Sequence, residues 1–126
     1  MKLLLIASKV TKKDDVDTAA NIIRRATEGR FELKTSNDID WTKVRENEGG
    51  WNGLPPWMAR NFDALAVIET DRGGLGRGTY DAAIAFLNAG KPIAVVRGEE
   101  LKRVTEVVPT GEDDWKTYYG KVIVAG

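Results

Sequence analysis

Apolar runs alternate with amphipathic segments along the chain. Three continuous apolar runs are typical of strands buried on both faces of a parallel sheet: residues 3–7, 65–68 and 92–96. Residues 31–35 alternate apolar and polar side chains, which indicates a strand near a sheet edge. Residues 104–108 and 122–125 predict two further short strands.

Helical patterns separate these strands. Residues 14–28 have apolar positions at helical spacing, with acidic residues in the first turn, Arg24 and Arg25 near the last turn, and Gly29 as a stop. Residues 79–89 predict a second helix, which Gly90 ends. The other predictions are short helices at 40–48 and 57–61, a loop at 49–56, a helical turn at 99–103, and a capped helical segment or loop at 111–120.

This order of elements predicts a single α/β domain spanning residues 1–126. We expect a doubly wound, mainly parallel sheet of about five strands, with helices on both faces. No internal repeat or interdomain linker is visible.

Composition narrows the possible chemistry. Lys plus Arg equals Asp plus Glu at 19 each, which argues against a dedicated nucleic-acid binder because phosphate neutralisation needs excess basic charge. The chain has no Cys and no His, so catalysis would use carboxylates, Lys, Tyr or hydroxyls, and a hard cation held by oxygens stays open. We predict no cofactor.

The N-terminal apolar run is too short for a signal peptide, and no run approaches a membrane span, so we expect a cytosolic protein without a membrane partner.

A glycine-rich loop is the strongest site signal. It contains Gly73, Gly74, Gly76 and Gly78, and it joins a buried strand to the helix that begins near Thr79. Ligands of open parallel sheets bind beyond the carboxyl ends of the strands, where Ser8 should also lie. Glycines allow close approach of a ligand, and a helix N-terminus favours anions. The alternative is a tight connector without a ligand.

Charged and aromatic side chains flank this loop. The carboxylates Glu69, Asp71 and Asp81 are candidates for a nucleophile, a base or a clamp on ribose hydroxyls, and Arg77 for pairing with phosphate. Asp81 has the alternative role of stabilising the helix dipole. Trp51 and Trp57 are candidates for a pocket wall that stacks on a base, or for core or interface packing.

Three segments carry a family resemblance. They are Phe-Asp-Ala-Leu-Ala-Val-Ile-Glu at 62–69, Gly-Arg-Gly-Thr-Tyr-Asp-Ala-Ala at 76–83, and Gly-Lys-Pro-Ile-Ala-Val-Val at 90–96. On them the chain resembles the nucleoside 2-deoxyribosyltransferase-like superfamily. The resemblance implies a flavodoxin-like fold, a homo-oligomer, and a pocket for a nucleoside or nucleotide in which a glutamate attacks the anomeric carbon.

The resemblance also assigns roles to single residues. Gly78 and Thr79 match the Gly-Thr of the family loop, whereas Gly76 and Arg77 stand where the family has Asp and Ser. Ala82 stands at the position of the nucleophilic Glu, so Asp81 or Glu69 would have to replace it, and Asp71 would hold the base or a hydroxyl.

Three functions therefore remain open at this stage. The first is a deoxyribosyltransferase or N-glycosidase-type enzyme that uses Asp81 or Glu69. The second is a non-catalytic module that binds or sequesters a nucleotide, as the missing carboxylate at Ala82 suggests. The third is a protein-interaction domain that uses the segment around Trp51 and Trp57.

Overall fold

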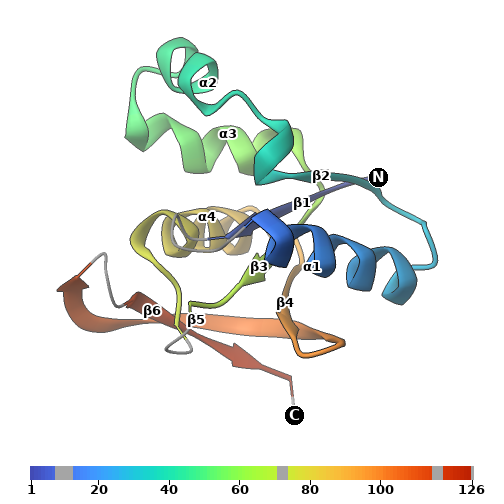
Figure 1. The fold of residues 1–126 in the computed structure, drawn as a ribbon. Helices are drawn as coiled ribbons and strands as arrows, with labels where there is room; N and C mark the ends of the chain where they lie inside the picture. The colour runs from blue at the N-terminus through green and yellow to red at the C-terminus, as the bar shows by residue number, and fades with distance from the viewer. Residues whose placement is uncertain (8–12, 71–73, 115–117, 126) are drawn as a thin grey trace.

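A six-stranded sheet carries helices on both of its faces in the computed structural model, which describes residues 1–7, 13–70, 74–114 and 118–125 (Figure 1). The strands are β1 (Lys2–Ala7), β2 (Glu32–Thr35), β3 (Ala64–Ile68), β4 (Ile93–Arg97), β5 (Glu100–Asp114) and β6 (Tyr118–Val124). The α-helices are α1 (Lys13–Ala26), α2 (Trp41–Asn47), α3 (Leu54–Asn61) and α4 (Arg77–Asn88), and the 3₁₀ helices are η1 (Ser36–Asp38) and η2 (Trp51–Gly53).

The sheet has the strand order β2-β1-β3-β4-β5-β6. The first four strands are parallel, whereas β5 runs antiparallel to β4 and β6 runs antiparallel to β5. The α/β class predicted from the sequence is confirmed. The finer prediction of about five, mainly parallel strands holds only in part, because the sheet has six strands and its last two, β5 and β6, pair antiparallel.

The turn between β4 and β5 explains this difference. Arg97 pairs with Glu100 across the two residues Gly98 and Glu99, and Gly98 has φ +60°. Parallel strands need a crossover of a dozen or more residues. A connection of two residues therefore forces an antiparallel hairpin. The helical turn predicted at 99–103 is therefore strand. Strand also replaces most of the segment predicted as helical or loop at 111–120, of which residues 115–117 lie outside the described part of the chain.

Two apolar layers enclose the sheet. Leu3 and Leu5 of β1 belong to a cluster with the buried face of α1, whereas Leu4 and Ile6 belong to a second cluster with α3 and α4. All four leucine and isoleucine side chains are buried. Successive side chains of a strand point to opposite faces, so a strand covered on both sides is apolar at every position.

The segment predicted as a loop at 49–56 is mostly helical. It forms η2 and the start of α3. Pro55 and Pro56 occupy the first turn of α3, where the backbone N–H that proline lacks has no partner within the helix. The turn before η2 depends on glycine, because Gly50 has φ +112° and a Cβ on Gly53 would lie 2.2 Å from the carbonyl oxygen of Glu48.

The chain between β3 and α4 is tied to the last strand. The N–H of Leu75 donates to the carbonyl of Gly120 at 2.8 Å, and the N–H of Gly120 donates back at 3.1 Å. Leu75 is fully buried. Within the described part of the chain, no helix is long and apolar enough to cross a membrane.

Candidate functional site

The carboxyl ends of β1 and β3 lie at the point where the strand order of the sheet reverses. From β1 the chain moves to β2 on one side and then returns to β3 on the other. Helix α3 leads directly into β3 and α4 leaves it, so both helices begin at this end of the molecule (Figure 1). The predicted residues at the start of α4 therefore lie at the carboxyl ends of the strands, where open α/β sheets bind ligands. Trp51 belongs to η2, which directly precedes α3.

The glycine-rich loop has two different parts. Gly74, Leu75 and Gly76 are buried, and the N–H of Thr70 donates to the carbonyl of Gly74 at 2.7 Å. Together with the bridge to Gly120, these bonds fit the connector alternative for the first half of the loop. Ser8, Asp71 and Gly73, which belong to the predicted site, lie outside the described residues.

The second part is the start of α4. Gly76 occupies the N-cap position with extended backbone (φ −64°, ψ 165°) and offers no side-chain cap. Gly78 is exposed, and a Cβ placed on it would meet nothing within 4 Å, whereas Thr79 is buried. The first N–H groups of a helix have no acceptor within the helix and carry its positive dipole end. This turn is thus open to an anionic or hydroxyl-bearing ligand.

Glu69 is held in an ion pair at the ends of β3 and β4. Arg97 donates from Nε to Oε1 at 2.8 Å and from a terminal nitrogen to Oε2 at 3.3 Å, and the Glu69 side chain is 13% exposed. This hydrogen bond raises the pKa of Arg97 above its ordinary value. Both carboxylate oxygens are engaged, so a nucleophilic role for Glu69 would require the pair to break first.

Asp81 and Ala82 differ in what surrounds them. Because α4 begins at Arg77, Asp81 falls at the start of its second turn, with a side chain 44% exposed and one oxygen 3.8 Å from Nε of Arg77. Partial burial raises the pKa of Asp81, and the charge of Arg77 opposes this shift. Ala82 is fully buried among the core residues of α4. Ala82, the position that the resemblance would give to the nucleophile, therefore faces the core, and Asp81 is the nearest carboxylate in sequence.

The two candidate tryptophans have different environments. Trp57 packs edge-on against Trp41 and Phe62, with ring centroids 6.2 and 6.1 Å apart, on the edge of the main core. Trp51 is 60% exposed, and the guanidinium of Arg45 lies 4.5 Å from the centre of its ring. The packing alternative fits Trp57, whereas Trp51 retains exposed ring surface for stacking.

Two residues of the family-like segments have contacts that stabilise the fold. Asp63 accepts a hydrogen bond from the backbone N–H of Lys2 at 2.8 Å, at the start of β1. Lys91 donates to the carbonyls of Ala59 and Phe62 at the end of α3, the second at 2.9 Å. A lysine at this position is also favoured by the helix dipole.

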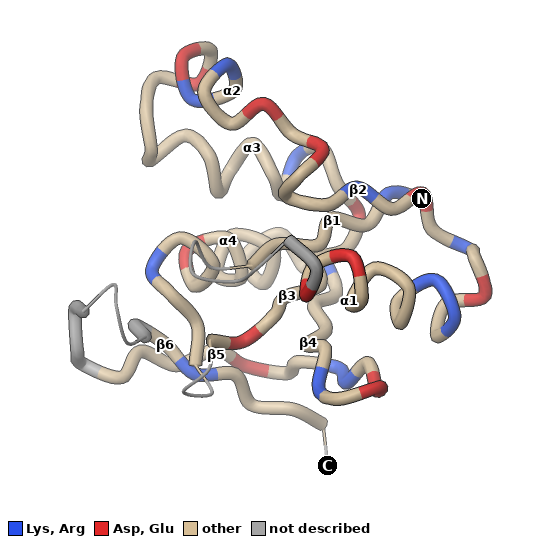
Figure 2. The backbone as a smooth tube through the Cα atoms, viewed as in Figure 1, with Lys and Arg blue, Asp and Glu red and all other residues tan. Residues whose placement is uncertain are grey.

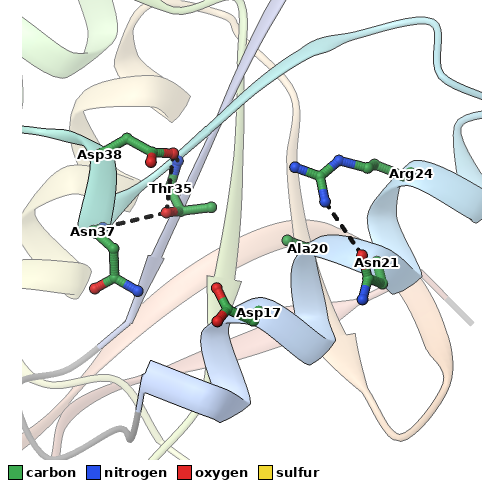
Figure 3. A pocket seen from close by; sticks show the side chains of 7 residues that line it. All are labelled: Asp17, Ala20, Asn21, Arg24, Thr35, Asn37 and Asp38. Carbon is green, nitrogen blue, oxygen red and sulfur yellow. Dashed lines mark hydrogen bonds between the residues drawn. The ribbon is translucent and has the colours of Figure 1, made fainter.

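A depression that the sequence did not suggest lies between α1 and the corner after β2 (Figure 3). Its volume is about 490 Å³, and its lining residues are Asp17, Ala20, Asn21, Arg24, Thr35, Asn37 and Asp38. None of the predicted site residues lines it. The available sequence signal was a polar stripe at positions 17, 21 and 24, which helical spacing places on one face of α1.

Among the described residues, no group of three or more potential ligands is arranged to hold a metal ion. No family model, curated protein or solved structure matches the chain. The resemblance to the deoxyribosyltransferase-like superfamily therefore stays a prediction.

Proposed function

We propose that this protein binds a nucleoside or nucleotide at the start of α4. The observation that carries the proposal is the first turn of α4, which has no side-chain cap and in which the exposed Gly78 leaves open space at the carboxyl ends of the strands. The order of the first five strands, 2-1-3-4-5, is that of flavodoxin-like sheets, although β5 is antiparallel here. That order supports a ligand at the carboxyl ends of β1 and β3.

The ligand would be held mainly by backbone groups. A phosphate or sugar hydroxyl accepts hydrogen bonds from the first N–H groups of α4, and the guanidinium of Arg77 adds charge beside them. Trp51, in the turn η2 before α3, would offer its exposed ring surface to a base. Because an uncharged nucleoside uses fewer of these contacts, we expect a nucleoside monophosphate to bind more tightly.

A second candidate function adds chemistry at the same place. Asp81 is partly exposed, and it lies one residue from the position where the resembling enzymes have their nucleophile. Its carboxylate would attack the anomeric carbon, the bond to the base would break with the electron pair leaving on nitrogen, and a second base or water would then release the sugar. The non-catalytic module is the same proposal without this step.

Binding is tested by calorimetry and thermal shift with deoxynucleosides and their 5′-monophosphates. The variant Gly78→Glu places a carboxylate in the first turn of α4, where the dipole tolerates it but a phosphate is repelled. Thr42→Glu adds the same group to the exposed first turn of α2 and serves as the matched control. We expect Gly78→Glu to lose binding at least tenfold and Thr42→Glu to keep it. Absence of binding by the unchanged protein would contradict the proposal.

Turnover is tested by chromatography after incubation with a deoxynucleoside and a free acceptor base. If Asp81 is the nucleophile, the unchanged protein releases or exchanges the base and Asp81→Asn does not, while its binding of the nucleoside persists. Binding without product assigns the non-catalytic module. Product formation that survives in Asp81→Asn would show that another group attacks.

A further inference from the structure

The depression beside α1 is lined almost entirely by polar side chains (Figure 3). Asp17, Asn21 and Arg24 form the wall from α1, whereas Asn37 and Asp38 belong to η1 on the opposite side. Ala20 is the one apolar residue of the lining. Such a wall offers both hydrogen-bond donors and acceptors to a small ligand.

Charged side chains of both signs line this depression. The guanidinium of Arg24 donates to Oδ1 of Asn21 at 3.2 Å, and among the described residues it forms no ion pair within 4.0 Å of Asp17 or Asp38. Figure 3 shows Arg24 on one side and the two carboxylates apart from it. The hydrogen bond from the Thr35 backbone does most to lower the pKa of Asp38, burial opposes this shift, and the Thr35 hydroxyl and the charges of Lys34 and, least of all, Arg24 add to it. Among the described residues, Arg24 and the two carboxylates thus line one depression without forming an ion pair.

A capping role accounts for part of this arrangement. The N–H and the hydroxyl of Thr35 both donate to Oδ2 of Asp38, at 3.0 and 3.2 Å, in a capping box at the start of η1. Oδ1 of Asp38 receives no hydrogen bond from the described residues. Capping explains neither Arg24 nor Asp17, whose side chains line the other wall.

We propose that this depression binds a small zwitterion that carries one carboxylate and one ammonium group, as amino acids do. The carboxylate would accept hydrogen bonds from Arg24 and Asn21, and the ammonium would donate to Asp17 and to Oδ1 of Asp38. A simple anion is repelled by the two carboxylates, and a simple cation by the guanidinium. A ligand with both charges can place its carboxylate against Arg24 and its ammonium against Asp17 and Asp38 in one orientation.

This site is separate from the one at α4. Helix α1 packs on the face of the sheet opposite to α3 and α4, so the depression does not share residues with the proposed nucleotide site. The depression is open to solvent, where salt and water weaken ionic contacts. We therefore expect dissociation constants on the order of 1 mM.

The ligand class is tested by NMR titration of the whole ¹⁵N-labelled protein. Glycine, β-alanine and γ-aminobutyrate carry the two charges at increasing separation, whereas N-acetylglycine and glycinamide each carry one. We expect at least one zwitterion to shift the amides of α1 and of residues 35–38 in a saturable way, at least fivefold more tightly than both single-charge compounds. No saturable shift with any zwitterion, or equal binding of a single-charge compound, overturns the proposal.

Matched variants locate the ligand. Arg24→Gln and Asp17→Asn should weaken binding of the responding zwitterion at least fivefold. Arg25→Gln and Asp15→Asn change the same residue types at exposed positions of α1 outside the depression, and they should bind as the unchanged protein does. All four positions are exposed, so circular dichroism should report an intact fold. Equal effects in a matched pair would place the ligand elsewhere.

Discussion

At the scale of single residues, the fold requires glycine at position 120 but not at position 78. A Cβ on Gly120 would lie 2.1 Å from Cδ2 of Tyr80, so the ring occupies the space that any side chain would need. Gly78 has open space around its Cα and no positive φ, so neither packing nor backbone conformation requires glycine there. A glycine that the fold does not need is a better candidate for ligand approach than one that it does.

We therefore predict opposite effects of alanine at these two positions. Gly120→Ala should lower the free energy of unfolding by about 1–3 kcal/mol, the usual cost of overpacking. Gly78→Ala should raise it by roughly 0.5 kcal/mol, because alanine favours the helix. Urea denaturation measures both. In a Tyr80→Ala background the cost of Gly120→Ala should shrink, and an unchanged cost there would show that the ring is not the cause.

At the scale of elements, the end of α3 depends on a residue from another part of the chain. Lys91, which follows α4, contributes its ammonium group to two carbonyls at the end of α3. Unsatisfied carbonyls at a helix end are otherwise left to water or to capping residues. A Gly-Lys-Pro sequence that resembles a family motif thus has a structural use in this fold.

We predict that Lys91→Met lowers the free energy of unfolding by about 1–3 kcal/mol, since hydrogen bonds to a charged group are lost while the aliphatic packing is kept. Lys102→Met is the matched control, because Lys102 is 44% exposed and pairs with the exposed Glu100. Its effect should stay within about 0.5 kcal/mol. Equal destabilisation by both substitutions, measured in urea, would contradict the capping role of Lys91.

At the scale of the whole molecule, the strand order predicts how stability is distributed. β3 lies between β1 and β4 and is covered by helices on both faces, whereas β2 and β6 are the edges of the sheet (Figure 1). Figure 2 shows charged residues on the helices, on the turns and on the outer strand β5 around this centre. Central strands open only in global unfolding, whereas edges open locally at lower cost.

We expect native-state hydrogen exchange to follow this order. The amides of Leu65, Ala66 and Val67 in β3 should exchange at the rate of global unfolding, and those of Leu33 and Lys34 in β2 should exchange at least a hundredfold faster. Equal protection of β2 and β3 would show that the sheet opens as one unit.

Several elements were predictable because their signals are local. The apolar runs of β1, β3 and β4 are continuous, and the apolar periodicity of α1 and α4 spans three turns or more. The pattern of buried positions therefore identifies each of these elements from its own residues. The predicted helix at 40–48 and the edge strand at 31–35 are also confirmed, as α2 and β2. The strand predicted at 104–108 lies within β5, but the antiparallel direction of β5 and its start at Glu100 were missed, because a two-residue turn, rather than the side chains of residues 99–103, decides them.

The candidate site divides in the same way. The amino-acid sequence alone shows the run of glycines at the start of α4 and the absence of histidine and cysteine chemistry. Only the tertiary fold pairs Leu75 with Gly120 and Arg97 with Glu69, and sets α1 beside η1 around an open, charged depression. Each of these contacts joins residues far apart in the chain. Local sequence patterns determine which segments form helices and strands. The pairing of charges and the lining of a depression depend instead on which separate segments the fold brings together.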